Sequence, residues 1–248
     1  MSRAASAKSP PVVAGDKPAR TKGGKTSRLR RIARFVLKLL AVLALIPAVL
    51  VPVYMVVPPI STLMIWTRVT NGPIERDWVG FDEIAKVLVV SVMVSEDGQF
   101  CAHGGVDWGA LNEVLEDPDG PSRGASTIAM QTVRNLFLWT SPSYVRKALE
   151  IPIALYADAI WTKRRTMEIY LNIAEWGPNI FGIEAAAQHH FGRSAKDLTA
   201  NQAALLAVTL PNPRVRNPAK PSRLMRSLAR TVAARARGAG DYIKCLYP

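Results

Sequence analysis

The sequence of 248 residues contains only two cysteines and three histidines. Cys101 and Cys245 are too few for a disulfide framework, although a compartment outside the cytoplasm would permit a bridge between them. The histidines, at positions 103, 189 and 190, show no spacing typical of a set of metal ligands. These shortages exclude a fold that depends on several disulfides or on a structural metal.

Alternating apolar and polar residues, the pattern of half-buried strands, are scarce after residue 80. The apolar spacing there is typical of helices, and Pro152 is expected to kink the longest of them. The predicted helices cover residues 82–97, 125–138, 144–175, 182–190, 199–209 and 221–237, and the predicted loops are 72–73 and 116–124. The sequence therefore predicts a mainly α fold.

Acidic residues are outnumbered, since 19 Asp and Glu face 32 Lys and Arg and the net charge is +13. The excess lies at the two ends. Residues 1–34 hold ten basic residues and one acid, residues 214–248 hold nine and one, and the part between them is net negative. A nucleic-acid-binding domain would carry its basic residues on the folded body, so no nucleic-acid partner is expected. The basic ends are expected to face a membrane or solvent.

Charged residues are absent from Leu39 to Trp66, and the first part of this range is long enough to cross a bilayer as a helix. Pro47 and Pro52 are tolerated in such a helix. A cleaved signal peptide is the alternative, but its apolar region is normally shorter and its basic leader is rarely this long. The basic residues before the span place the amino terminus in the cytoplasm. Residues 1–34 are predicted to be disordered.

Two adjacent carboxylates, Glu96 and Asp97, lie at the end of the first helix predicted after this span, where a glycine is a natural stop. The macrodipole disfavours negative charge at a helix carboxyl terminus, and the apolar neighbours Val94 and Phe100 would limit solvation. Both effects raise the pKa of a carboxyl group, which suits a general base. The alternative is a frayed helix end with solvated acids. The buried face of this helix is predicted to hold Ile84, Val87, Leu88 and Ser91.

Hydroxyl and cationic side chains gather in the next predicted helix. Ser126 or Thr127 could cap its amino terminus, and the other would still present a hydroxyl there. Gln131 and Arg134 would share a face because they are three residues apart. A helix amino terminus beside an arginine is a candidate phosphate site, although many capped helices carry an arginine nearby without binding phosphate.

A third group consists of Arg146, Lys147 and Glu150. The two cations precede the carboxylate by four and three residues, so all three would lie on one face of a helix. An ordinary ion pair on a helix surface is the alternative.

These groups occur in an order that is more specific than any one of them. The ordered motifs are Glu96-Asp-x-x-Phe100-x-x-His103-x-Gly105, Gly124-Ala-Ser-Thr-Ile-x-x-Gln131, Arg146-Lys-x-x-Glu150, Lys163…Glu168-x-Tyr-Leu-Asn172 and Gly177…Phe181-Gly-Ile-Glu-Ala-Ala-Ala187. Over residues 80–218 this order resembles the peptidoglycan glycosyltransferase family. No penicillin-binding transpeptidase domain follows the motifs, which predicts the monofunctional type.

The resemblance implies a lysozyme-like helical lobe beside a small membrane-proximal jaw, with a cleft between them. It implies an enzyme that polymerises lipid II into β-1,4 glycan strands with inversion and releases undecaprenyl pyrophosphate. The expected partners are lipid II, the nascent strand, the bilayer, and cell-wall synthesis or division proteins. The expected location is the bacterial inner membrane, with a single span and a periplasmic catalytic domain. The expected divisions are a cytoplasmic tail (1–34), a transmembrane and membrane-proximal segment (35–66), the glycosyltransferase domain (67–220), and a basic carboxyl-terminal helix and tail (221–248).

The resemblance also assigns roles to seven residues. Glu96 corresponds to the family's catalytic base, and Glu150 to a second glutamate that stabilises the donor side or positions its cations. The residues expected to bind substrate are Ser126, Gln131, Arg134, Lys147 and Arg146. No metal site and no required cofactor are expected, although Mg²⁺ or another divalent cation could bridge the pyrophosphate.

Three positions depart from the family pattern. Ala129-Met130 stands where a hydroxyl residue and a glutamine are common, and Arg134 replaces the commoner lysine, which changes the geometry of its contacts. Ser141-Pro142 lies where many relatives have another arginine, for which Arg146 or Arg164 could substitute. A lytic enzyme that cleaves glycan strands and a non-enzymatic division scaffold are the alternative functions.

Overall fold

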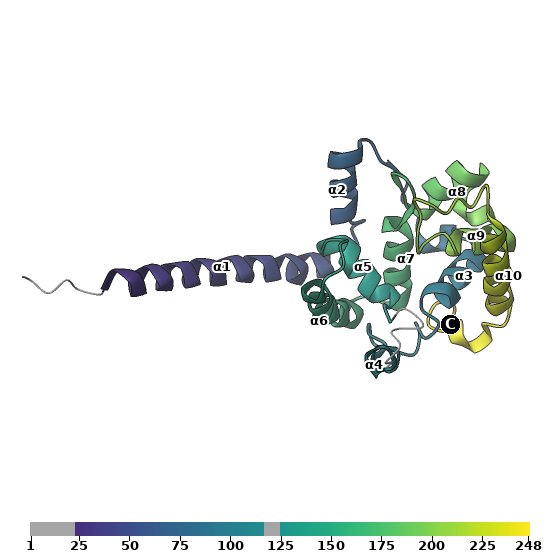
Figure 1. Ribbon diagram of the computed structural model, residues 1–248. Helices are drawn as coiled ribbons and strands as arrows, with labels where there is room; N and C mark the ends of the chain where they lie inside the picture. Colours follow the sequence, from purple (N-terminus) through teal and green to yellow (C-terminus); the bar gives the residue numbers. More distant parts are fainter. Residues whose placement is uncertain (1–22, 117–124) are drawn as a thin grey trace, which may run out of the picture. The chain divides into compact units, whose positions relative to one another are not determined.

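The computed structural model describes residues 23–116 and 125–248, and within these ranges the chain is mainly helical, as predicted (Figure 1). The α-helices are α1 (Gly23–Val53), α2 (Thr62–Asn71), α3 (Lys86–Glu96), α4 (Trp108–Glu116), α5 (Ile128–Phe137), α6 (Tyr144–Ile160), α7 (Lys163–Ile173), α8 (Ile183–Phe191), α9 (Ala200–Ala207) and α10 (Arg223–Arg237). Three 3-10 helices are η1 (Phe81–Glu83), η2 (Ala195–Asp197) and η3 (Gly240–Ile243). The loop predicted at 116–124 lies outside the described residues except for Glu116, which ends α4.

The range 144–175, predicted as one helix kinked at a proline, is two helices. Pro152 lies inside α6 without ending it. The break comes at Trp161, whose ψ of 144° is extended, and the Thr162 side chain then accepts a hydrogen bond from the backbone N–H of Arg165 to begin α7. A capping threonine therefore sets the boundary more strongly than the proline does.

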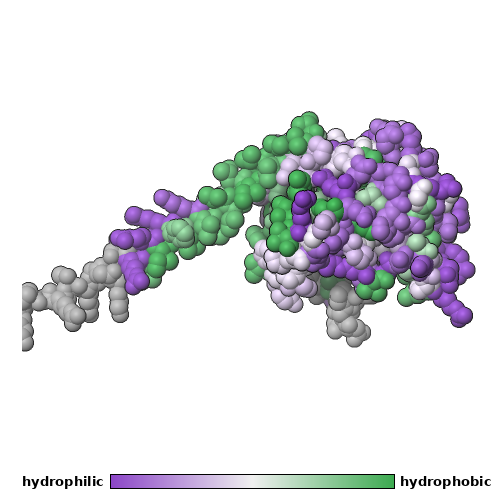
Figure 2. All heavy atoms as spheres, turned by 90° about the horizontal axis from the view of Figure 1, so that it is seen from above, coloured by the Kyte–Doolittle hydropathy of each residue, from purple (hydrophilic) through white to green (hydrophobic). Residues whose placement is uncertain are grey.

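The chain divides into two compact units, Met1–Leu45 and Ile46–Pro248. In the first unit, the described part of α1 begins hydrophilic and becomes apolar (Figure 2). The part of α1 from Arg28 to Val53 is long and apolar enough to cross a membrane. The disorder predicted for residues 1–34 falls outside the described residues up to residue 22, whereas residues 23–34 are helical. Arginine, lysine and leucine are good helix formers, so the helix extends from the apolar span into the basic segment.

The second unit contains two clusters of buried apolar side chains. One is built around α3, which packs against both α9 and α10, and the other joins the end of α1 to α2, α5 and α6. The helices α5 and α7 contribute to both clusters, so they form the junction between them. Trp161 fixes the end of α1 to this unit, because its indole N–H donates to the carbonyl of Val51 over 2.7 Å.

The buried face predicted for α3 is only partly correct. Leu88 and Ser91 are buried, as is Ile84 just before the helix, but Val87 is 40% exposed. Every residue from Leu88 to Met93 is buried. Because α3 runs between α9 and α10, it is enclosed on several sides after its first turn, and a one-sided apolar stripe does not describe it.

A small sheet in the order β1–β3–β2 lies beside α8. The strands β1 (Glu75–Arg76) and β3 (Ile180–Phe181) are parallel, whereas β2 (Glu175–Gly177) and β3 are antiparallel. These strands have two or three residues each, which is too short for an alternating pattern to be recognised in the sequence.

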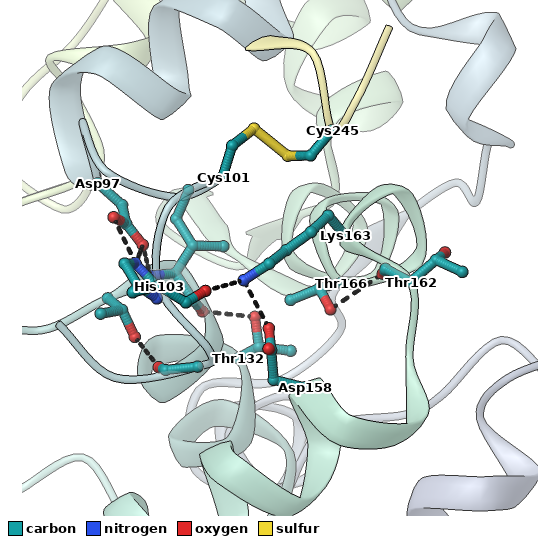
Figure 3. Close-up of polar contacts among 12 residues, drawn as sticks. Asp97, Cys101, His103, Thr132, Asp158, Thr162, Lys163, Thr166 and Cys245 are labelled. Carbon is teal, nitrogen blue, oxygen red and sulfur yellow. Dashed lines mark hydrogen bonds and ion pairs between the residues drawn. A yellow bond between two sulfur atoms is a disulfide. The ribbon is translucent and has the colours of Figure 1, made fainter. Parts of the chain in front are cut away.

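A disulfide joins Cys101, in the loop after α3, to Cys245, in the carboxyl-terminal tail, with the Cα atoms 5.5 Å apart (Figure 3). The sequence had left this pairing open. The tail is also packed, since Ile243 and Leu246 are buried in the same cluster as α3. The division at residue 220 stays a prediction, and α10 beyond it packs against α3 and α9.

Candidate active site

Glu96 is the last residue of α3 and lines a cleft of about 530 Å³. Burial raises the pKa of its carboxyl group, while a hydrogen bond from Gln131 and the positive charges of Arg134 and Arg216 act in the opposite direction. Burial is the largest of these effects, so the net shift is upward. The upward direction predicted from the sequence is confirmed, and the alternative of a frayed end with solvated acids is wrong.

Gln131 connects Glu96 to the protein interior. Its Nε2 donates to Oε2 of Glu96 over 3.2 Å, and its Oε1 accepts from the hydroxyl of Tyr170 over 3.2 Å. Tyr170 is buried on α7. Because the tyrosine donates to the amide oxygen, the amide nitrogen is turned toward the carboxylate. Tyr170 therefore orients the side chain that holds Glu96.

Asp97 links the end of α3 to the beginning of α5. Its Oδ2 accepts a hydrogen bond from the backbone N–H of Ile128 over 2.9 Å. Its Oδ1 lies 2.9 Å from Nε2 of His103, and this contact is drawn in Figure 3. The carboxylate thus sits at the amino terminus of α5, where negative charge is favourable. It keeps the helix that carries Gln131 beside the helix that carries Glu96.

The capping alternatives at α5 are resolved in favour of Thr127. Its Oγ1 accepts from the backbone N–H of Met130 over 3.1 Å and donates to the carbonyl of Gly105 over 2.6 Å. Ser126 is therefore not used as the cap, and its Oγ accepts a hydrogen bond from Nζ of Lys147 over 2.8 Å. Gly105 has a φ of +83°, and a Cβ there would lie 2.7 Å from the carbonyl oxygen of Ala154, so only glycine fits.

Arg146 and Lys147 are partly buried on α6 and pair with a buried carboxylate, Glu150, so the alternative of an ordinary surface ion pair is wrong. Glu150 is only 1% exposed, is paired with Arg146, and has Oε2 3.5 Å from Nζ of Lys147. Burial, together with repulsion from Arg134 and Arg146, lowers the pKa of Lys147 to about 8. The sequence placed the three residues on one face but gave no indication of their burial.

The structure brings the predicted site residues into one connected group. Hydrogen bonds join Glu96 to Gln131 and Ser126 to Lys147, and ion pairs extend the second set to Glu150 and Arg146. Arg134 acts electrostatically on members of both sets. The cleft is lined by both Glu96 and Ser126. A carboxylate with a raised pKa thus lies beside hydroxyl and cationic groups suited to an anion.

Sequence reasoning missed Arg216, whose charge lowers the pKa of Glu96. Its guanidinium donates to the carbonyl of Val208 over 2.6 Å, which holds it after α9. Its position just before Asn217-Pro218, in the last part of the matched range, was the only signal. Arg164, considered as a substitute cation, instead pairs with Asp82 over 2.7 Å, so Arg146 is the one that lies in the cation group.

Lys163, a member of the ordered motifs, has structural partners. Its Nζ donates to Oδ1 of Asp158 over 2.7 Å and to the carbonyl of His103 over 2.6 Å (Figure 3). It therefore fastens the loop after α3 to the end of α6. In the described part of the chain, no three His, Cys, Asp or Glu residues are grouped so as to hold a metal ion.

Comparison with known proteins gives a consistent result. The family model described as Transglycosylase matches residues 65–237. A biosynthetic peptidoglycan transglycosylase of Brucella suis biovar 1 (strain 1330) is 60% identical over 214 residues, covering 85% of this chain and 96% of the relative. Proteins of the same name are 56% identical in Rhizobium meliloti (strain 1021), covering 89% of this chain and 94% of the relative, and 55% identical in Mesorhizobium japonicum, covering 92% and 98%.

Proposed function

The chain belongs to the transglycosylase family, and from this premise we propose that it polymerises lipid II into the glycan strands of peptidoglycan during cell-wall synthesis. In the proposed reaction, the 4-hydroxyl of the acceptor's N-acetylglucosamine attacks the anomeric carbon of the lipid-linked muramyl sugar. The new β-1,4 bond forms as the bond to pyrophosphate breaks, with inversion. The hydroxyl proton passes to the enzyme, and undecaprenyl pyrophosphate leaves.

Glu96 is the proposed base. The observation that carries the assignment is that its carboxyl group lines the cleft and has a pKa raised by burial. A base must be ionised when it acts yet bind a proton readily, and a raised pKa strengthens the second property. Gln131 and Tyr170 hold the carboxylate in place through the two hydrogen bonds described above.

The cations of α5 and α6 are the proposed pyrophosphate site. A leaving pyrophosphate gains negative charge in the transition state, so fixed positive groups lower the barrier more than a strong acid would. Lys147 and Ser126 already share a hydrogen bond, and Arg134 lies close enough to repel Lys147. Glu150 forms ion pairs with both Arg146 and Lys147 and so holds their charged ends in position. A divalent cation such as Mg²⁺ would be bound by the pyrophosphate oxygens, and no step of the proposed reaction depends on such a cation.

The proposed location is a bacterial inner membrane, with the catalytic unit on its outer, periplasmic side. The span from Arg28 to Val53 and the basic residues before it support this topology. The disulfide between Cys101 and Cys245 supports it independently, because disulfides persist mainly outside the reducing cytoplasm. Both substrates are lipid-linked, so an anchored enzyme would meet them at the bilayer surface. Contacts with wall-synthesis or division proteins stay a prediction.

The test is polymer formation from labelled lipid II by the purified protein. Glu96→Gln should lower the rate at least roughly a hundredfold, the range expected for loss of a general base, without changing the unfolding transition. Glu83→Gln is the matched control, since Glu83 is an exposed carboxylate paired with Lys196 at the surface. Full turnover in Glu96→Gln would remove Glu96 from this role.

Two results would contradict the proposed activity as a whole. Wild-type protein that makes no polymer, under conditions in which a relative does, would favour the scaffold. Release of soluble fragments from mature wall would favour the lytic enzyme.

A further inference from the structure

The carboxyl-terminal tail returns to the loop that follows Glu96. After α10 the chain forms η3, and Cys245 is bonded to Cys101 in that loop. Leu246 is fully buried in the core, and its carbonyl accepts a hydrogen bond from Arg164 over 3.0 Å. The tail is therefore fixed by a covalent bond, by burial and by a hydrogen bond, although it lies beyond the residues that the family model matches.

The last turn of α10 and this fixed tail both help to line the candidate active site. Arg235, near the end of α10, and Tyr242, in η3, line the same cleft as Glu96 and Ser126. Tyr242 is 62% exposed, and within the described residues its side chain has no hydrogen bond and no ring contact. The tail residues Ala239 and Ile243 on either side are buried, whereas the ring of Tyr242 is exposed at the cleft.

We propose that Tyr242 and Arg235 form a binding subsite for the sugar–peptide units of the glycan, beside Glu96. The proposal rests on the proposed function and adds residues of this chain to it. Tyr242 would stack its ring on the apolar C–H face of a pyranose, and its hydroxyl would remain free to bond a sugar hydroxyl. Arg235 would pair with a carboxylate of the peptide carried by the muramyl sugar, for which its planar guanidinium is suited.

The disulfide acts as the tether of this subsite. Tyr242 lies three residues before Cys245, so the bond limits how far the ring can move from the cleft. Its other end, Cys101, lies two residues before His103, whose ring contacts Asp97. One crosslink therefore connects the tail to the loop that leads out of the catalytic helix (Figure 3).

The experiment measures binding of a soluble, lipid-free peptidoglycan fragment to the full chain in detergent, using labelled glycan oligomers that carry their peptides. Lipid-free fragments are used so that the bilayer and the pyrophosphate site do not contribute. Tyr242→Ala should weaken binding roughly 3- to 10-fold, and Tyr242→Trp should restore it. Arg235→Ala should weaken binding roughly 2- to 5-fold, and only for fragments that keep their peptides. Arg237→Ala is the matched control on the same helix, because Arg237 is exposed but does not line the cleft.

Replacing both cysteines by serine should weaken fragment binding in the same direction as Tyr242→Ala, while polymerisation of saturating lipid II persists. Unchanged binding in Tyr242→Ala by a protein that polymerises lipid II would overturn the subsite and leave the proposed function standing. A wild-type chain that neither polymerises lipid II nor binds fragments would overturn both.

Discussion

The carboxylate that the proposed reaction needs accepts a hydrogen bond from the side-chain amide of Gln131. Gln131 donates to Glu96, and this bond lowers a pKa that burial raises. Gln131→Met keeps the shape of the side chain and removes the donor, so the pKa of Glu96 should rise further. Because the base must be deprotonated, the acid limb of kcat/KM for lipid II should move to higher pH in this variant.

The pH profile distinguishes this effect from a simple loss of substrate contact. Loss of a contact would lower kcat/KM equally at every pH and leave the midpoint of the acid limb in place. Gln188→Met on α8 is the control, because Gln188 bonds Glu184 instead of Glu96.

Lys147 should set the alkaline limb. Burial and its arginine neighbours lower its pKa to about 8, so in the free enzyme its charge is present below that pH and is lost as the pH rises through it. If the ammonium binds pyrophosphate, kcat/KM should fall above about pH 8. Lys147→Arg stays charged throughout and should remove this limb, even if its geometry lowers the maximum. An alkaline limb that persists unchanged in Lys147→Arg would assign it to another group.

For single residues, the sequence predicts which side chains form the site better than it predicts their burial and charge interactions. The i, i+3 and i, i+4 spacings placed Arg146, Lys147 and Glu150 together correctly. Spacing carries no information about burial, however, so it could not separate a surface ion pair from a carboxylate that is 1% exposed. Arg216 was missed for a related reason, since only the folded path after α9 brings it near Glu96.

At the scale of elements, the beginning of α5 is the most sensitive position, because it carries the site. Thr127→Ala removes the cap and should lower the free energy of unfolding by about 0.5–2 kcal/mol. It should also reduce polymerisation, since Ser126 and Gln131 flank the cap. Thr199→Ala removes the equivalent cap of α9, which lies away from the cleft residues, and should destabilise the protein without changing kcat. Equal activity in the two variants would contradict a positioning role for the α5 cap.

The elements themselves were largely predictable where the signals are local. The beginnings of α9 and α10 follow capping residues, and their observed bounds lie within two residues of the prediction. The break at Trp161 was not predicted. The range 144–175 was expected to be one helix kinked at Pro152, and the cap supplied by Thr162 was not recognised. The helix α4 was missed; it runs directly into the predicted loop at 116–124.

At the scale of the whole molecule, the unit Ile46–Pro248 includes the last turns of α1, and this has a consequence for truncation. Val51 is fully buried, and its carbonyl accepts from the indole of Trp161. The carbonyl of Ala48 accepts from the hydroxyl of Tyr156 over 2.9 Å. The end of the span is thus also a part of the core that supports α5 and α6.

The free energy of unfolding of a chain that begins at residue 46 should therefore lie within about 1 kcal/mol of that of the full chain. For a chain that begins at residue 54, the free energy of unfolding should be lower by about 2–5 kcal/mol. The larger loss has two causes. Removing Val51 exposes the apolar surface that it covered, and the buried indole N–H of Trp161 loses its hydrogen-bond acceptor. Urea unfolding followed by circular dichroism measures both values. Trp161→Phe removes the donor and should narrow the difference between the two truncations, since no buried N–H is then left without a partner. Equal stability of the two truncated chains would contradict this account, because residues 46–53 would then contribute nothing to the stability of the core.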